Sequence, residues 1–176
     1  TYVYTDPFYA LDLKDPTNPM EVGQLEFEGF TNYLHPIGKD LILGIGQHTV
    51  DQQELGFMVS LFDVSDLSQP VMLHSYIEFV TDQQWVYSEA RHDHRALRFF
   101  DGKNILVVPI TIDTWDSDEE NFDGFHLYRV DPVDGITHYL SIEHGSDHFH
   151  DGCWSYNGFM SPRSKIIEKD VLDIRD

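Results

Sequence analysis

The sequence is poor in cysteine and in positive charge. Cys153 is its one cysteine, which excludes an intrachain disulfide and a cysteine-rich zinc module but leaves a bond to another chain open. Its 11 Lys and Arg stand against 31 Asp and Glu, a formal net charge of −20. A surface of this sign repels phosphate backbones and anionic membranes, so we expect no nucleic-acid partner. The one local basic cluster is the stretch from Arg91 to Arg95.

Long apolar runs are also missing. No stretch approaches the roughly 18 residues that a spanning helix needs, so we expect no direct membrane insertion. No signal peptide or initiator Met is visible at Thr1, which suggests a processed or excised piece. No long amphipathic helix pattern is present either. The hydrophobic content of 41% and the aromatic content of 14% are nevertheless enough for a folded core.

Short apolar strands and polar turns recur along the chain. The segments Tyr9–Pro19 and Ser60–Pro70 match at Asp12/Asp63, Asp15/Asp66 and Pro19/Pro70, always at an offset of 51 (63 − 12). In each, a predicted strand leads into an Asp/Ser/Pro-rich turn and a second strand.

The repeat continues in two further places. Lys39-Asp40 aligns with Lys103-Asn104 at an offset of 64, so the second copy holds 13 extra residues (64 − 51), which we expect between Glu78 and Arg91. Both pairs predict β-hairpins. A third copy, Phe125–Ile142, repeats strand, Asp-Pro turn and strand.

These repeats predict an all-β fold. Units of about four short strands have the size of a propeller blade, so we expect an incomplete β-propeller of three to four antiparallel blades. The whole chain, 1–176, would be one partial domain with repeat units at about 8–47, 57–112 and 125–176. A β-sandwich is the alternative, although sandwiches rarely duplicate turn sequences.

Three motif-rich segments give the chain a family resemblance. The segments Phe30–Gln47, Ser60–Pro70 and Tyr87–Leu97 resemble the secreted β-propeller domain proteins, a poorly characterised family distantly related to WD40 propellers. The residues that match the family pattern are, in order, Gly29, Phe30, Tyr33, Leu34, His35, Pro36, Gly44, Ile45, Gly46, Gln47, Phe62, Asp63, Val64, Ser65, Tyr87, Ser88, Glu89, Ala90, Asp93, His94 and Ala96.

The resemblance implies a propeller fold and a secreted, extracellular or lumenal location, but no catalytic residues. It marks His35, Asp63, Asp93 and His94 as structural, with Asp93 and His94 a buried hydrogen-bonded pair. Propellers need about four to eight blades, so further blades or another chain would complete the ring. An exposed blade edge would otherwise invite aggregation.

The histidines offer two candidate metal sites. If Arg91–Arg95 is a strand, His92 and His94 share one face and could bind a transition metal, against the repulsion of the flanking arginines. The second cluster combines His144, His148, His150 and Asp151 near Cys153, a ligand set that suits Zn²⁺, Cu²⁺ or Fe²⁺. An exposed loop between blades is the alternative for this polar, Gly-rich sequence.

The stretch Asp113–Gly124 is a candidate calcium site. It holds six carboxylates, and Asp116, Asp118, Glu120 and Asp123 are the proposed ligands, since Ca²⁺ takes six to eight oxygens. Read as an EF-hand from Asp116 it fails, because Asn121 stands where Gly is needed and Leu127 where Glu is needed. A solvated acidic insertion between two strands is the alternative.

The sequence therefore predicts a non-enzymatic binding or scaffolding module, part of a secreted or lumenal assembly. A protein partner would dock through acidic residues and loop aromatics such as Trp85 and Trp115. The competing hypotheses are a metal-dependent enzyme at the His144–Asp151 cluster and a Ca²⁺-stabilised structural subunit. No nucleophile elbow, P-loop or dinucleotide fingerprint is present, and no cofactor is predicted with certainty.

Overall fold

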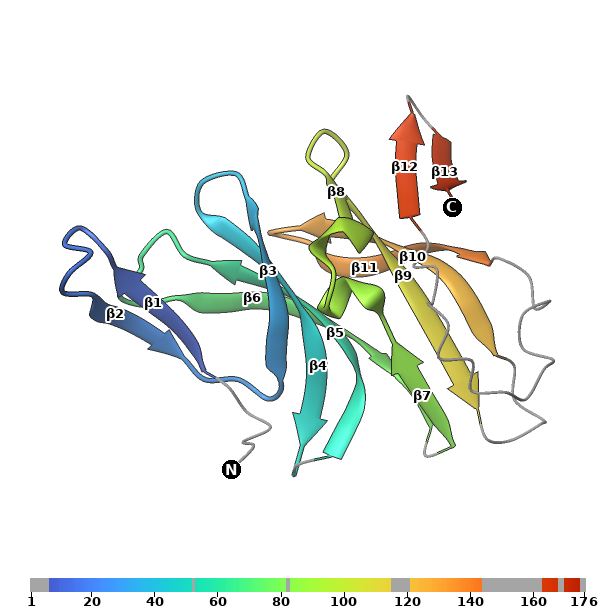
Figure 1. Ribbon diagram of the computed structural model, residues 1–176, viewed down its shortest axis with the longest axis horizontal. Helices are drawn as coiled ribbons and strands as arrows, with labels where there is room; N and C mark the ends of the chain where they lie inside the picture. The colour runs from blue at the N-terminus through green and yellow to red at the C-terminus, as the bar shows by residue number, and fades with distance from the viewer. Residues whose placement is uncertain are drawn as a thin grey trace. The chain divides into compact units, whose positions relative to one another are not determined.

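The computed structural model describes residues 7–51, 53–81, 83–114, 121–143, 163–167 and 170–174. Within these ranges the chain forms antiparallel β-strands and two single 3₁₀ turns (Figure 1). The all-β expectation is confirmed. Within the described residues these two turns are the only helical segments, and neither is long enough to span a bilayer.

Two compact units divide the chain. Unit 1 consists of Thr1–Phe79 with Asp131–Ile136, and unit 2 of Val80–Val130 with Thr137–Asp176. The first holds a two-stranded sheet and a four-stranded sheet. The four-stranded sheet is a meander in chain order of β3 (Phe30–Ile37), β4 (Leu41–Val50), β5 (Gln53–Asp63) and β6 (Val71–Phe79).

The central strands of this meander form the core of unit 1. Their side chains are buried in continuous runs rather than in alternation, which means that both faces of the sheet are covered. The largest fully buried side chains here are Phe57, Phe62, Leu43, Ile45, Leu61 and Val59.

A second hairpin in unit 1 repeats the hairpin β5–β6 residue by residue. It consists of β1 (Phe8–Asp12) and β2 (Met20–Leu25), and its five pairs recur in β5–β6 at an offset of 51. A bulge interrupts both ladders after the third of these pairs. Since bulges are specific features of a sheet, the duplicated sequence encodes a duplicated structure. The first pair is Phe8 with Leu25 in one hairpin and Val59 with Tyr76 in the other.

The turns of the repeated hairpins share one hydrogen bond. In each, an aspartate Oδ1 accepts the backbone N–H of the residue two places on at 2.8 Å, the geometry of an Asx turn. The aspartates are Asp12, Asp63 and Asp131. The match between Asp12 and Asp63 in sequence is thus a match in structure.

The β1–β2 hairpin packs on the four-stranded sheet. The ring of Phe8 lies 5.2 Å from that of Phe62, and Phe27 lies 5.6 Å from it, measured between centroids. Gly23 of β2 contacts the β5–β6 turn so closely that an added Cβ would come within 2.0 Å of Leu67 O. This hairpin is therefore fixed against its neighbour by both its aromatic face and its backbone.

The second large sheet begins with a divided strand. Its order is β11-β10-β9-β7, and β8 pairs with the other end of the β9 edge that β7 occupies. Between β7 and β8 lie the two 3₁₀ turns, η1 and η2. The bounds are β7 (Gln84–Tyr87), η1 (Glu89–Arg91), η2 (His94–Ala96), β8 (Arg98–Phe100), β9 (Ile105–Thr114), β10 (Phe122–Asp131) and β11 (Gly135–Glu143).

This division places the extra residues of the second copy. By strand pairing, Phe30 corresponds to Tyr87 (offset 57) and Pro36 to Phe99 (offset 63). About six extra residues (57 − 51) therefore lie before Tyr87, within the expected span Glu78–Arg91, and about six more (63 − 57) lie in the segment between β7 and β8. The prediction that His92 and His94 share one face of a strand is wrong. Capped 3₁₀ turns replace the strand there, because Ser88 and Asp93 accept backbone N–H groups that a strand would direct to its neighbour.

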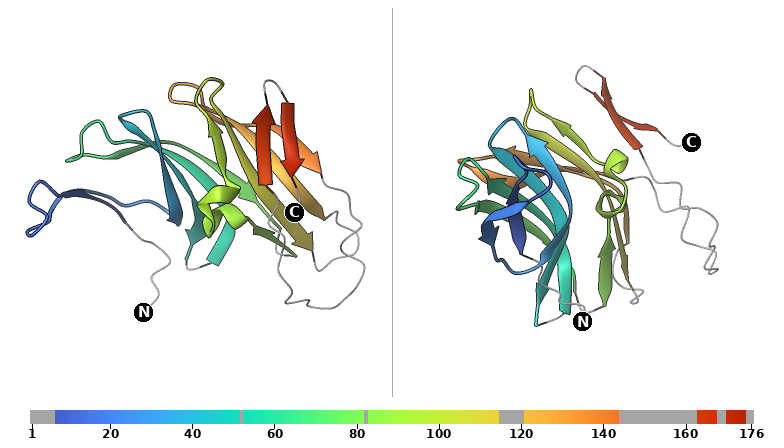
Figure 2. Two further views of the ribbon diagram at one scale, coloured as in Figure 1. Left: turned by 45° about the horizontal axis from the view of Figure 1, so that its top comes forward. Right: turned by 60° about the vertical axis from the view of Figure 1, so that its left-hand side comes forward.

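A last hairpin comprises β12 (Arg163–Ile167) and β13 (Asp170–Ile174), drawn in red in Figures 1 and 2. The repeat in the sequence is out of phase with the sheets. Its second copy begins at β5, the third strand of a sheet, and continues through β6 into the strands of the next sheet, β7 to β9. The sheets, in contrast, begin at β3 and β7. The single domain 1–176 and the repeat limits 8–47, 57–112 and 125–176 stay predictions.

Candidate functional site

The segment Ser88–Arg98 of unit 2, named here the basic loop, is anchored on β9 through Ser88. The Ser88 hydroxyl donates to Pro109 O at 2.7 Å and its oxygen lies 3.3 Å from the Ala90 N–H that it accepts. Pro109 sits in the part of β9, Val108–Ile110, that neither β7 nor β8 pairs. The serine therefore satisfies a strand carbonyl that the divided strand leaves unpaired, and caps η1 as well.

Small buried side chains and the ion pair of Asp93 with Arg95 hold the rest of the basic loop. Ala90 and Ala96 are both fully buried. Asp93 caps η2 by accepting the Arg95 N–H at 2.9 Å, and its carboxylate binds the Arg95 guanidinium through Nε at 3.0 Å and Nη2 at 3.1 Å. Such a two-point contact fixes the guanidinium plane. The loop is thus a preformed surface on a rigid support.

Tyr87 secures the start of the basic loop. Its hydroxyl donates to Glu89 Oε2 at 2.7 Å, and its ring stacks on His92 at 6.0 Å between centroids. Burial, reinforced by the Glu89 hydrogen bond, raises the pKa of Tyr87 to about 12. The phenol is therefore protonated at physiological pH and donates its hydrogen bond to the Glu89 carboxylate.

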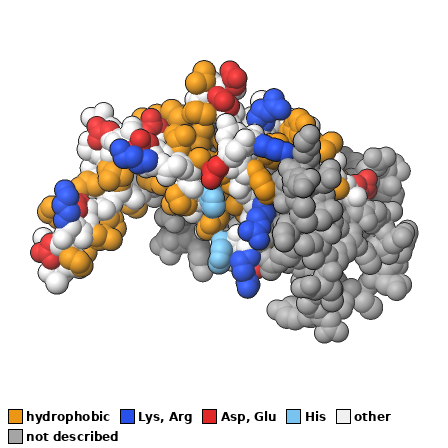
Figure 3. Space-filling view, turned by 90° about the horizontal axis from the view of Figure 1, so that it is seen from above, with side chains coloured by type: hydrophobic (Ala, Val, Ile, Leu, Met, Phe, Trp, Pro, Cys, Tyr) orange, Lys and Arg blue, Asp and Glu red, His pale blue; other side chains and the backbone are white. Residues whose placement is uncertain are grey.

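Positive charge gathers on the exposed side of this loop. His92, His94, Arg95 and Arg98 are exposed, and Arg91 is half-buried. With Lys103 just beyond β8, residues 91–103 contain four of the chain's 11 Lys and Arg, against two acidic residues. Figure 3 shows Lys, Arg and His side chains close together on one face of the molecule. Guanidinium and imidazole groups so placed suit the binding of carboxylates.

The residues that the resemblance marks as structural lie in different surroundings. His94 is exposed and Asp93 is half-buried, so the expected burial of the Asp93–His94 pair is wrong, and the Asp93 carboxylate binds the Arg95 guanidinium. The local reason is the 3₁₀ turn, which brings the Arg95 backbone and guanidinium to the carboxylate. Asp63 forms the Asx turn described above, and His35 Nδ1 lies 3.2 Å from the Tyr33 hydroxyl.

The candidate metal and calcium sites fall mostly outside the described residues. This applies to His144, His148, His150 and Asp151, and to Asp116, Asp118 and Glu120. Asp123 lies on β10, where its Oδ1 accepts the Thr111 hydroxyl at 3.2 Å. Within the described ranges, no three His, Cys, Asp or Glu side chains come together as metal ligands. These sites stay predictions.

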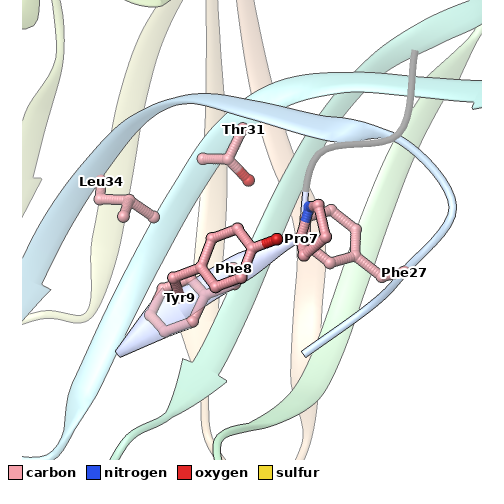
Figure 4. Close-up of a pocket in the computed structure, with 6 residues that line it drawn as sticks. All are labelled: Pro7, Phe8, Tyr9, Phe27, Thr31 and Leu34. Carbon is pink, nitrogen blue, oxygen red and sulfur yellow. The ribbon is translucent and has the colours of Figure 1, made fainter. Parts of the chain in front are cut away.

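A pocket of about 230 Å³ lies in unit 1 beside β1 (Figure 4). Five of its lining residues are apolar or aromatic, and the sixth is a threonine whose buried Oγ1 has no hydrogen-bond partner among the described residues. The sequence patterns did not indicate this pocket, because its walls come from separate strands that only the packing on Phe62 brings together. The lining residues are Pro7, Phe8, Tyr9, Phe27, Thr31 and Leu34.

Comparison with known proteins places the chain in a family. Uncharacterized proteins of Archaeoglobus fulgidus and Methanocaldococcus jannaschii are each 38% identical to it over 109 residues. The match covers 62% of this chain but only 16% of each relative's length. No solved structure matches it. The family model of the beta propeller domain matches residues 1–176, as the internal repeat and the antiparallel sheets lead one to expect, and the chain belongs to that family.

Proposed function

We propose that this β-propeller domain is a non-enzymatic binding and scaffolding module of a secreted or lumenal protein, and that the basic loop binds an acidic protein segment. The observation that carries the proposal is the concentration of four cations within residues 91–103, three of them in the basic loop, in a chain whose net charge is −20. An acidic partner is repelled by most of such a chain and attracted at this loop, so the charge pattern selects one orientation of docking.

The rigidity of the basic loop supports a binding role. A loop held by Ser88, Ala90 and Ala96 loses little conformational entropy when a partner binds, which favours affinity. Arg98 carries no ion pair within the described part of the chain, so its charge is available to a carboxylate. The secreted or lumenal location rests on the family resemblance, and fractionation of the source cells would test it.

The binding proposal is tested with a labelled oligo-glutamate peptide and fluorescence anisotropy. The paired change Arg91→Ala with Arg98→Ala is expected to weaken binding about tenfold or more, equivalent to roughly 1.4 kcal/mol. Lys14→Ala with Lys39→Ala is the matched control, because it removes the same charge from exposed sites in unit 1. Affinity should also fall as salt rises from 50 to 200 mM.

Two results would contradict the proposal. Equal losses in both double variants would show that only net charge matters. Tighter binding of a single-stranded DNA oligonucleotide of the same charge would point to a phosphate ligand instead of an acidic protein.

A further inference from the structure

Two imidazoles and a phenol gather on one face of the second large sheet, in unit 2. His126 and Tyr128 lie two residues apart on β10, so their side chains share a face, and His138 lies on the neighbouring strand β11. The three rings form a triangle. Its sides, measured between centroids, are 5.0 Å from His126 to His138, 5.9 Å from Tyr128 to His138 and 6.1 Å from His126 to Tyr128.

The inner side of this triangle is buried and polar. Tyr128 is fully buried and His126 is 6% exposed, whereas His138 is exposed. Buried polar groups need polar partners, and His126 Nδ1 lies 3.3 Å from the Tyr128 hydroxyl. This distance is longer than the roughly 2.7–3.2 Å that is usual for a hydrogen bond between nitrogen and oxygen. The pair is therefore close enough to share a ligand but is not tightly bonded.

These separations fit a shared metal ion. Imidazole nitrogen binds Zn²⁺ at about 2.0–2.1 Å, so two ligand atoms on one tetrahedral ion lie about 3.3 Å apart. By the same geometry, two coordinated imidazole rings have their centroids about 5 Å apart, and an imidazole and a phenol about 6 Å apart. The 3.3 Å between His126 Nδ1 and Tyr128 Oη and the three ring separations agree with these values.

Neighbouring side chains hold two of the rings in place. Ser141 Oγ lies 2.9 Å from His138 Nε2, which makes Nδ1 the coordinating nitrogen of His138. The ring of Phe122 packs on that of His126 at 4.6 Å between centroids. Outer hydrogen bonds of this kind orient metal-bound imidazoles. The terminal torsion of histidine is broad, so the His138 ring can turn its nitrogen toward the ion.

The charges around the cluster favour a cation. The chain carries a net charge of −20, which attracts cations in general. Arg129 follows Tyr128 in the sequence but lies on the opposite face of β10, where its guanidinium is 5.2 Å from the centre of the Tyr139 ring. The basic loop differs in this respect, because three arginines accompany its histidines.

We propose that His126, Tyr128 and His138 bind one divalent transition-metal ion, Cu²⁺ more tightly than Zn²⁺, and that the ion links β10 to β11. Imidazole suits both ions, and Cu²⁺ forms the stronger complexes. A water molecule on the exposed His138 side completes the coordination. With two histidines and a tyrosine, the site differs from the sets of three His, Cys, Asp or Glu side chains considered above.

Isothermal titration calorimetry with Cu²⁺ tests the site. The full chain carries His144→Ala, His148→Ala and His150→Ala, because these histidines are themselves a predicted metal site. One Cu²⁺ per chain is expected, with weaker binding of Zn²⁺. Adding His138→Ala should weaken Cu²⁺ binding at least about tenfold, since loss of an outer hydrogen bond alone costs metal sites that much.

Two further variants separate the ligands from the rest of the chain. Tyr128→Phe keeps the buried ring, removes only the hydroxyl, and should also weaken Cu²⁺ binding. His94→Ala is the matched control, because it removes an exposed imidazole from the basic loop and should leave the affinity unchanged. Circular dichroism checks that each variant keeps its β-rich fold.

Amide exchange tests the link between the strands. Saturating Cu²⁺ should slow exchange in β10 and β11 of the chain that retains His138, since an ion bound only to the folded state stabilises it. The His138→Ala chain should show no such slowing.

Three outcomes would overturn the proposal. The first is a chain without His144, His148 and His150 that binds no Cu²⁺. The second is equal affinity of the His138→Ala and His94→Ala chains. The third is a folded Tyr128→Phe chain that binds Cu²⁺ as tightly as its parent, which would exclude the phenol as a ligand.

Discussion

The two large sheets are built from related sequences, yet their first strands differ. β3 is one continuous strand along β4, while the corresponding edge of β9 is shared by β7 and β8 with the basic loop between them. The offset of 64 aligns Gly44, Ile45 and Gly46 of β4 with Val108, Pro109 and Ile110 of β9. These three positions decide whether a neighbouring strand can pair along the whole edge, as β3 does on β4, or is interrupted, as it is on β9.

The glycines of β4 permit the close approach of β3. A Cβ on Gly46 would lie 1.9 Å from Phe30 O, and one on Gly44 would lie 3.1 Å from the Thr31 side chain. At the same places in β9, Val108 and Ile110 carry large buried side chains. Pro109 between them lacks the N–H that a strand ladder needs. In the second sheet the basic loop therefore lies beside these residues of β9, where in the first sheet β3 pairs with β4.

The largest effect is expected from Gly46→Ala. The added methyl would force β3 away from β4, and we expect a loss of about 2–3 kcal/mol in the free energy of unfolding, as for other overpacked sites. Urea denaturation measures it. Gly102→Ala is the control, because nothing lies within 4 Å of a Cβ there. Equal stability of the two variants would mean that the glycines do not decide the course of β3.

A smaller effect is expected from Ser88→Ala. It leaves the buried Pro109 carbonyl without its hydrogen bond and removes the cap of η1, so we expect a loss of about 1–2 kcal/mol. Amide exchange should quicken in η1 more than in β3. Ser68→Ala, on an exposed turn of unit 1, is the control. An unchanged exchange rate in η1 would show that the basic loop does not depend on this anchor.

The smallest effect is expected when the pH is lowered and the aspartates of the hairpin turns become protonated. The Asp63 carboxyl has its pKa lowered by hydrogen bonds with Ser65, and hydrogen bonds likewise lower the pKa of Asp12, Asp15, Asp66 and Asp131, all in unit 1. A lowered folded-state pKa adds stability that is present above the ordinary aspartate pKa of 3.8 and is lost as the pH falls through the folded-state pKa.

The hairpin turns of unit 1 are therefore expected to lose protection from amide exchange below about pH 4. Amide exchange followed between pH 5 and 2 measures this loss. Asp63→Asn keeps the acceptor and should reduce the pH dependence at its own turn. An unchanged pH dependence at that turn in Asp63→Asn would show that the Asp63 carboxylate does not stabilise it.

The candidate binding site could be predicted only partly from the sequence. The basic stretch from Arg91 to Arg95 stands out in so acidic a chain, but its shape does not, because period-two spacing and two capped turns look alike over five residues. Ser88 and Arg98 belong to the site because the strand along β9 is divided into β7 and β8, with the basic loop between them. The pocket beside β1 left no trace in the sequence, since its walls lie in separate elements.

The sequence alone determined the all-β class, the copied hairpins and their Asx turns. These depend on local periodicity and on turn residues such as Asp12 and Asp63, whose bonds span only two or three positions. Tertiary structure decided which of the described strands share a sheet and where β9 loses its neighbour. Those properties depend on contacts between residues far apart in the chain, such as Gly46 with Phe30 and Ser88 with Pro109, and no local pattern encodes them.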